Sequence, residues 1–191
     1  LLAAASASQL EVEIAAVGVS GMGPCVLLAD DADEPVRPAI LYGVDTRATA
    51  QIDRMTDELG VAEITRVGGS TLTTQAGGPK IVWIADEEPA AYAAARRLFM
   101  PASWLARHLT GAYVLDHQSA SQVSPLYDVE REEWHADNWA RYAPGIEAPR
   151  LLWAGDIAGQ VTDAAAAATG LPAGIPVIAG TIDAWSEAVS V

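Results

Sequence analysis

The chain has 191 residues, 51% of them hydrophobic and 19% charged, which is enough for one large domain or two small ones with a substantial core. Its 25 acidic and 11 basic residues give a formal net charge of −14, which argues against nucleic-acid and membrane partners. No apolar run is long enough to span a membrane. The single cysteine, Cys25, excludes an internal disulfide and fits a reducing cytoplasm, and no metal ligands are assigned.

The first half of the chain is expected to alternate strands and helices. Ile14–Val19 is a branched apolar run typical of a buried strand, and Ser20–Pro24 turns the chain. Cys25–Leu28 is expected to pair with the first strand like a hairpin. Apolar residues at spacings of three or four predict helices over Thr46–Leu59 and Val61–Val67.

The second half continues the same alternation. Helices are predicted over Lys80–Asp86, Pro89–Phe99, Pro101–Leu109, Trp134–Tyr142 and Thr162–Thr169, with strands at Ala112–Leu115 and Pro176–Ala179. Gly77-Gly78-Pro79 is expected to belong to a loop. The strands are expected to share one mixed sheet with helices packed on it, which places the chain in the α/β class. Both ends look cut, because Leu1–Leu10 resembles the tail of a helix and the stretch from Asp183 a helix barely begun.

The strongest local signal for chemistry lies near the end of the chain. Pro176–Asp183 combines a buried strand, a glycine turn and an acid at a helix start. Ligands of open α/β sheets bind beyond the carboxyl ends of strands, and Gly180 lets the backbone approach a ligand closely. Asp183 could therefore meet a substrate hydroxyl. The alternative is that Asp183 only caps the helix.

Three further motifs each allow two interpretations. Asp45 and Arg47 flank a helix start, so they either bind a ligand or form a cap and a surface ion pair. The glycine turn Ser20–Pro24 either presents backbone groups to a polyhydroxyl ligand or merely joins two strands. His117 follows a strand end, where it is either structural or functional. Trp134 and Trp139 are expected in the core.

Taken in order, several segments resemble the N-terminal domain of the FGGY carbohydrate kinases, the group that contains xylulokinase and glycerol kinase. The resemblance covers essentially the whole chain. The segments that carry it are Ala16–Gly23, Arg37–Arg47, Gly78–Trp83, Leu109–Asp116, Ser119–Ser121, Leu126–Asp128 with Trp134, and Gly170–Asp183.

The resemblance implies a ribonuclease H-like, actin-type fold of two α/β domains with the active site between them. Residues 1–191 would form an incomplete first, sugar-binding domain. The implied reaction moves the γ-phosphate of ATP, with Mg²⁺, to a hydroxyl of a sugar or polyol, with a pentulose or hexulose favoured. The resemblance implies that Asp183 is the base that accepts the hydroxyl proton. Its position at a helix start would help keep its carboxylate ionised.

The resemblance also implies the remaining site residues. Substrate contacts fall on Met22, Gly23, Asp45, His117 and Asp183, and nucleotide contacts on Gly180 and Thr181. Xylulokinases have Met-His and glycerol kinases Arg-Glu at the first two positions, so Gly23 lacks the polar side chain. His117 replaces the tyrosine of glycerol kinases. Gly43, beside Tyr42, replaces the usual tryptophan. These departures argue against glycerol and xylulose and favour a roomier pocket for another ketose or polyol.

Two parts of the implied kinase are not in the sequence. A hairpin with an Asp-x-Gly-Thr/Ser phosphate loop would precede Leu1, and a nucleotide-binding domain would follow Val191. The chain is therefore expected to be a fragment of a cytoplasmic kinase, inactive alone. The alternatives are a non-catalytic sugar-binding or degenerate kinase domain and an unrelated α/β binding module. The assembly state, a homodimer included, stays open.

Overall fold

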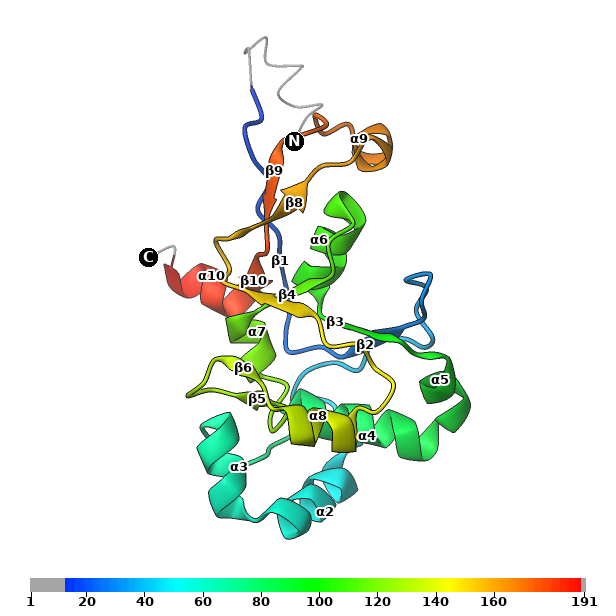
Figure 1. Ribbon diagram of the computed structural model, residues 1–191, viewed down its shortest axis with the longest axis vertical. Helices are drawn as coiled ribbons and strands as arrows, with labels where there is room; N and C mark the ends of the chain where they lie inside the picture. Colours follow the sequence, from blue (N-terminus) through cyan, green and yellow to red (C-terminus); the bar gives the residue numbers. More distant parts are fainter. Residues whose placement is uncertain (1–12, 190–191) are drawn as a thin grey trace.

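Short strands and helices alternate along the chain in the computed structural model, which describes residues 13–189 (Figure 1). The expected helix tail at Leu1–Leu10 lies outside the described residues. The strands are β1 (Ser20–Gly21), β2 (Leu27–Ala29), β3 (Arg97–Phe99), β4 (Val114–Asp116), β5 (Tyr127–Asp128), β6 (Glu133–Trp134), β7 (Arg150–Leu152), β8 (Ile157–Gln160), β9 (Pro176–Ile178) and β10 (Thr181–Ile182). The helices are α2 (Thr49–Leu59), α3 (Val61–Gly68), α4 (Gly77–Glu87), α5 (Pro89–Ala94), α6 (Pro101–Thr110), α7 (His117–Ser121), α8 (Ala136–Tyr142), α9 (Asp163–Thr169) and α10 (Asp183–Val189). This mixture confirms the α/β class.

The strands pair two by two rather than in one mixed sheet. Within residues 13–189, β1 pairs with β10 and β4 with β7 in parallel, whereas β2–β3, β5–β6 and β8–β9 are antiparallel. The expected single sheet and the expected hairpin are therefore wrong. The apolar segment Ile14–Val19 does lie beside β9, because an isolated parallel bridge joins Val17 to Val177. An apolar run indicates burial, but it does not specify which strand becomes its partner.

The alanine-rich segment expected as one helix over Pro89–Phe99 divides into two elements. Helix α5 ends at Ala94, and β3 follows and pairs with β2. Leu98 and Phe99 are fully buried in this pairing. The apolar area that they remove from water outweighs the helix propensity of the alanines, which is worth at most about 0.7 kcal/mol per residue.

Glycines 77 and 78 form the first turn of α4 instead of a loop, which corrects the sequence-based expectation. Gly77 N–H donates to the carbonyl of Gln122. A Cβ on Gly78 would lie only 2.5 Å from the carbonyl oxygen of Ser124. The helix therefore begins with glycines because its start packs against the backbone of a neighbouring segment.

The other helices agree closely with the expected ones. Helix α9 begins after Thr162, whose hydroxyl accepts a hydrogen bond from Ala165 N–H, and Gly170 ends it in a left-handed conformation. Helix α8 begins two residues later than expected, because Trp134 belongs to β6. Trp139 is buried and Trp134 packs on the same cluster, as expected.

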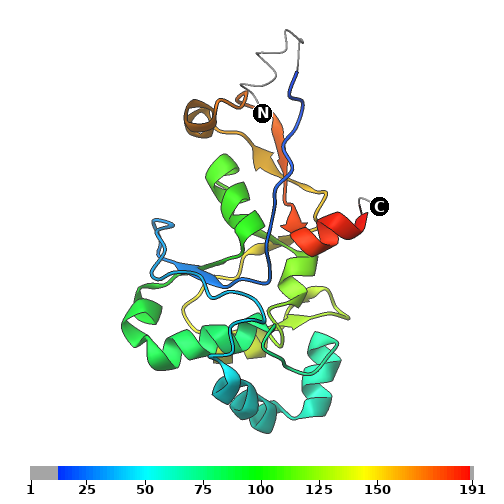
Figure 2. The same ribbon diagram turned by 180° about the vertical axis from the view of Figure 1, so that it is seen from behind.

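Two hydrophobic clusters lie on either side of β4, which is labelled near the middle of Figure 1; Figure 2 shows the same ribbon from behind. Val114 belongs to the smaller cluster, together with residues of α6, α9 and β9. Leu115 belongs to the larger cluster, which holds residues of α2, α3, α4 and α8. Successive side chains of a strand point to opposite faces, so β4 buries residues in both clusters and its end, Asp116, lies between them.

A half-buried ion-pair network ties the loop after β2 to β3 and α6. The carboxylate of Asp33 accepts hydrogen bonds from Arg97 at 2.5 Å and from Arg107 at 2.7 Å. Burial tends to raise the pKa of Asp33, but the bonds from Arg107 and Arg97 outweigh burial, so the pKa lies below its ordinary value. Asp33 has φ of 66°, a conformation that asparagine also tolerates.

Replacing Asp33 with Asn should therefore remove the charge without backbone strain. We expect a loss of about 1–3 kcal/mol of unfolding free energy at pH 7, because two guanidinium groups lose their anion. Since the folded pKa is the lower one, the stabilisation is present above the ordinary aspartate pKa of about 3.9 and is lost as the pH falls through the folded value. Thermal melts at pH 7 and pH 3 check this.

The neighbouring exposed Asp31 provides the control, as Asp31→Asn should leave the melting temperature nearly unchanged. A melting-temperature difference between the Asp33→Asn variant and the unmodified chain that is as large at pH 3 as at pH 7 would contradict the electrostatic explanation.

Candidate active site

Met22 and Asp183 lie side by side at the carboxyl ends of two paired strands. Strands β1 and β10 are parallel, with Ser20 opposite Thr181 and Gly21 opposite Ile182 (Figure 1). Met22 and Asp183 are the next residues of the two strands, and neighbouring strands are about 4.8 Å apart. Two residues that are distant in sequence therefore share the edge where open α/β sheets bind ligands.

Asp116 connects His117 to the same edge. Asp116 is 2% exposed, and its carboxylate accepts hydrogen bonds from the hydroxyl of Thr181 at 2.6 Å and from Ser119 N–H at 3.0 Å. The second bond caps α7, whose first residue is His117. The first bond ties the start of α7 to β10, two residues before Asp183. His117, Met22 and Asp183 are thereby brought to one end of the β1–β10 pair.

The imidazole of His117 contacts two aromatic side chains. Its Nδ1 is 2.7 Å from the hydroxyl of Tyr127, and its ring lies 4.4 Å from that of Trp153 at an angle of 35°. His117 is half-buried, so its second nitrogen, Nε2, remains the atom with which it can bind a ligand.

Asp45 does not cap the helix that follows it. Helix α2 begins at Thr49, and no side chain accepts a hydrogen bond at its N-cap, Ala48. The carboxylate of Asp45 instead pairs with Arg47, whose Nε lies 2.9 and 3.0 Å from the two oxygens. These hydrogen bonds hold the pKa of Asp45 below its usual range. The guanidinium of Arg47 also lies over Trp83, 4.7 Å from the ring centroid.

Lys80 is a functional candidate that the sequence analysis missed. It is 1% exposed, and its ammonium donates a 2.6 Å hydrogen bond to the carbonyl of Leu41. Burial lowers the pKa of Lys80, and the charges of Asp45 and Cys25 oppose this effect. The only sequence signal for this role is a lysine within the apolar pattern of α4.

The thiol of Cys25 interacts electrostatically with both Lys80 and Asp183. Burial raises the pKa of the Cys25 thiol, a backbone hydrogen bond with Tyr42 and the charge of Lys80 lower it, and the charge of Asp183 raises it further. Lys80 interacts electrostatically with Asp45 as well. Among the described residues no hydrogen bond or ion pair joins Asp45 to Met22, His117 or Asp183, so its place in the site stays a prediction.

Asp183 keeps its carboxylate available. It is half-buried and is the first residue of α10 rather than the residue before the helix. Within residues 13–189 its carboxylate accepts one hydrogen bond, 2.8 Å from Ala184 N–H. This bond is a local contact with the backbone of the second helical residue, so Asp183 contributes to the helix start, and its role as cap or as base stays a prediction.

Gly180 and Thr181 have structural contacts of their own. Gly180 has φ of 69°, and a Cβ at this position would lie 2.0 Å from the carbonyl oxygen of Val19. Thr181 is buried and donates to Asp116. Both residues also line a hollow of about 320 Å³ together with Trp185 and Gln118. Their assignment to the nucleotide stays a prediction.

Gly23 faces a side chain instead of empty space. A Cβ on Gly23 would lie 2.1 Å from Cγ2 of Ile182, which is itself buried. The volume that a polar side chain would begin to occupy at position 23 is therefore filled by Ile182. The missing side chain does not by itself make the pocket roomier at this point.

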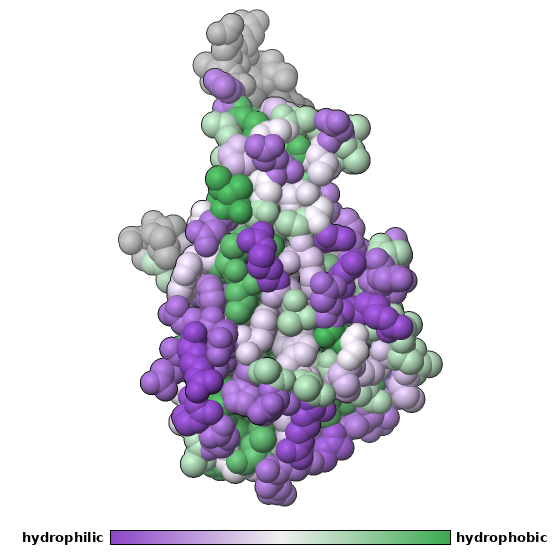
Figure 3. All heavy atoms as spheres, in the orientation of Figure 1, coloured by the Kyte–Doolittle hydropathy of each residue, from purple (hydrophilic) through white to green (hydrophobic). Residues whose placement is uncertain are grey.

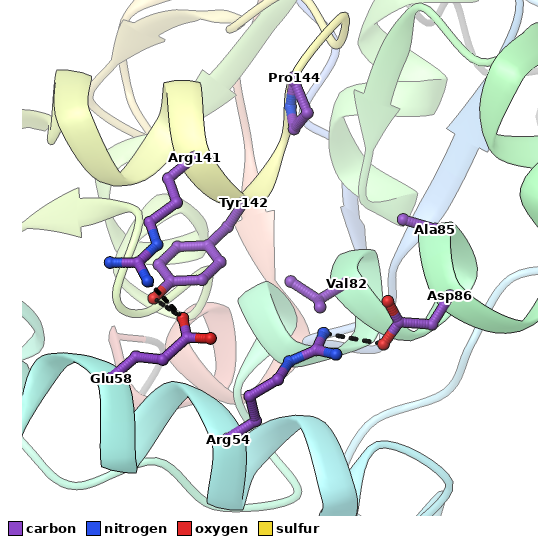
Figure 4. A pocket seen from close by; sticks show the side chains of 8 residues that line it. All are labelled: Arg54, Glu58, Val82, Ala85, Asp86, Arg141, Tyr142 and Pro144. Carbon is purple, nitrogen blue, oxygen red and sulfur yellow. Dashed lines mark hydrogen bonds and ion pairs between the residues drawn. The ribbon is translucent and has the colours of Figure 1, made fainter.

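Another hollow, of about 290 Å³, lies between α2, α4 and α8, apart from this edge (Figure 4). Its charged side chains are already paired, Arg54 with Asp86 and Arg141 with Glu58, each at 2.8 Å. Tyr142 donates to Glu58 as well. These internal pairs make it a less suitable ligand site than the edge that holds Asp183.

The described residues also limit other kinds of site. Residues 13–189 contain no group of three or more His, Cys, Asp or Glu side chains placed to hold a metal ion. None of the helices within residues 13–189 is long and apolar enough to cross a membrane. On the face seen in Figure 3, apolar surface gathers at the left centre, over the region from β8 to α10.

Proteins of known name resemble this chain over most of its length. An L-xylulose/3-keto-L-gulonate kinase of Escherichia coli is 32% identical over 184 residues, which cover 93% of this chain and 36% of that protein. A xylulose kinase of Streptomyces coelicolor is 33% identical over 183 residues, 90% of this chain and 35% of that protein. The chain thus spans about a third of the length of these curated relatives.

Solved structures agree with the sequence relatives. The crystal structure of xylulose kinase from Rhodospirillum rubrum superposes on this chain with a TM-score of 0.88 and 28% identity. The match covers 100% of this chain and 39% of the xylulose kinase chain. A glycerol kinase structure from Plasmodium falciparum, 18% identical, shares the fold with a TM-score of 0.85. The chain therefore has the ribonuclease H-like, actin-type fold of these sugar kinases, as a partial domain, which confirms the fold that the resemblance implied.

The family model described as the N-terminal domain of the FGGY family of carbohydrate kinases matches residues 3–190. This range contains every element and every candidate residue described above. The chain therefore belongs to the FGGY family of carbohydrate kinases, through that family's N-terminal domain.

Proposed function

We propose that this chain is the sugar-binding part of a kinase that transfers the γ-phosphate of ATP to a hydroxyl group of a sugar or polyol. The observation that carries the proposal is the parallel β1–β10 register, which sets Asp183 beside Met22. The Asp116–Thr181 hydrogen bond adds His117 to the same edge. Membership of the carbohydrate kinase family supports the reaction class.

In the proposed mechanism, Asp183 accepts the proton of the attacking hydroxyl while Met22, Asp45 and His117 orient the sugar. A carboxylate whose single described hydrogen bond comes from Ala184 retains lone pairs for that proton. Mg²⁺ and the rest of the protein would neutralise the charge of the phosphates. Asp45, by contrast, is already paired with Arg47.

The length of the relatives supports a division of labour. Because this chain spans about a third of them, we propose that the rest of a longer protein supplies most of the ATP and Mg²⁺ contacts. The 1–191 chain would bind sugar but not turn it over alone. We further propose a cytoplasmic setting, with a homodimer as one assembly to be tested. The alternative, a non-catalytic sugar-binding domain, is an outcome of the first test below.

The proposed substrate is a ketose. The relatives are named for xylulose and for L-xylulose and 3-keto-L-gulonate, which are keto sugars or their acid derivatives. Ile182 fills the space beside Gly23, so no charged side chain lies there to bind an acidic part of a ligand. His117 then remains as the nearby polar group able to bind a sugar oxygen.

Replacing Asp183 with Asn tests the proposed base. The amide keeps the size of the side chain and can still bind a hydroxyl group, but it cannot accept its proton. In the full-length protein we expect kcat to fall by about 10²–10⁴, with a much smaller change in sugar affinity. The measurements are steady-state kinetics with ATP and a panel of ketoses and polyols, together with a thermal melt.

Asp163→Asn is the matched control, because Asp163 also opens a helix, α9, away from the site. It should leave kcat unchanged. A kcat for Asp183→Asn within about threefold of the unmodified enzyme would mean that Asp183 is not the base. A folded full-length protein that binds sugars without phosphorylating any of them would favour the non-catalytic alternative.

A second test concerns the contact between Gly23 and Ile182. Gly23→Ala should destabilise the chain by about 1–3 kcal/mol, because the added methyl group overlaps Cγ2 of Ile182. Ile182→Ala removes that atom, so the double variant should be more stable than the sum of the two single effects, by about 0.5–3 kcal/mol. Urea unfolding of the four chains gives this coupling.

Additive effects of the two substitutions would show that the space beside residue 23 is free, and the roomier pocket would then be the correct interpretation. A favourable coupling supports Ile182 as the residue that limits the pocket at this position.

A further inference from the structure

The surroundings of His117 determine which of its ring nitrogens carries the proton. Tyr127 is 3% exposed, and its hydroxyl lies 2.7 Å from Nδ1 of His117. Burial raises the pKa of Tyr127 to about 12, so the phenol keeps its proton at neutral pH. Within residues 13–189 the His117 ring is the only hydrogen-bond partner of this hydroxyl.

Matching hydrogen-bond donors with acceptors favours one tautomer of His117. If the Tyr127 hydroxyl donates to Nδ1, both groups are satisfied, and the neutral imidazole of His117 carries its hydrogen on Nε2. If Nδ1 instead carried the hydrogen and donated to the phenol, the buried hydroxyl hydrogen would have no acceptor among the described residues. A buried donor without a partner costs about 1–3 kcal/mol.

Both aromatic partners of His117 are held by strand pairing. Strand β7 pairs with β4 so that Leu152 lies opposite Asp116, which places Trp153 next to His117 at the ends of two parallel strands. Tyr127 lies in β5 opposite Trp134 of β6, and the rings of these two residues meet edge to face, 5.8 Å apart. The two rings that contact His117 therefore come from segments whose backbones are placed by strand pairing.

We propose that Tyr127 is a positioning residue that holds His117 with its proton on Nε2, so that His117 offers an N–H donor to an oxygen atom of the sugar. The tautomer follows from the contacts of the chain itself. Only the identity of the acceptor, a sugar oxygen, rests on the proposed function.

The tautomer can be measured on the 191-residue chain without any assay of activity. Nitrogen-15 NMR distinguishes a protonated from an unprotonated ring nitrogen, and His117→Gln identifies the signals of His117 among the three histidines. At a pH where His117 is neutral, we expect hydrogen on Nε2 and a Nδ1 resonance that moves when Tyr127→Phe removes its donor. Hydrogen on Nδ1 in the unmodified chain, or an unmoved resonance, overturns the proposal.

Kinetics on the full-length protein test the consequence for the sugar. Tyr127→Phe should raise KM for the sugar about 5–30-fold, with kcat and KM for ATP changed by less than about threefold. In the His117→Gln background, adding Tyr127→Phe should change KM for the sugar by less than about twofold, because Tyr127 acts through His117.

Tyr142→Phe is the matched control, because Tyr142 is also buried and its hydroxyl donates to Glu58 in another part of the fold. It should leave KM for the sugar unchanged. An equal rise in KM for this control, or an undiminished effect of Tyr127→Phe in the His117→Gln background, would reduce Tyr127 to a structural role. If the full-length protein phosphorylates no sugar, the proposed function fails, and the NMR experiment still decides the tautomer.

Discussion

The buried carboxylate of Asp116 holds together parts of the candidate site that come from distant positions in the chain. It accepts one hydrogen bond from the hydroxyl of Thr181 and one from the backbone of Ser119. A buried polar group without hydrogen-bond partners is costly, so both bonds stabilise this carboxylate in its position. Helix α7 and strand β10 are thereby fixed to the end of β4. The positions of His117 and Asp183 follow from that attachment.

Local patterns predicted the helices well and the sheets poorly. The cap at Thr162 and the stop at Gly170 are chemical signals contained in a few neighbouring residues, and α9 has those limits. The pairing of β2 with β3 depends on residues about seventy positions apart, and no local pattern reveals it. The same long-range pairing explains why the alanine-rich helix stops early, since Leu98 and Phe99 gain more by burial against β2.

The site was predictable where it follows strand ends and obscure where it depends on buried partners. Asp183 was proposed from its strand, glycine turn and helix start, whereas Met22 was proposed only through the family resemblance, and both follow directly on a strand in the structure. Lys80 lies in an apolar helix pattern, and its hydrogen bond to Leu41 becomes visible only in three dimensions. The contact between Gly23 and Ile182 joins two turns that the sequence treats as separate, so the expectation of extra space could not be checked without coordinates.

The contact between Ser20 in β1 and Ser186 in α10, 3.2 Å between their hydroxyl oxygens, spans 166 positions of the chain. Ribosomes add about 5–20 residues each second, so the second serine is made roughly 8–33 s after the first. Throughout that interval β1 has no partner at its β10 edge, and such an edge invites association with other chains. If Asp183 binds a sugar as proposed, that ligand can stabilise this part of the fold only after β10 has been made.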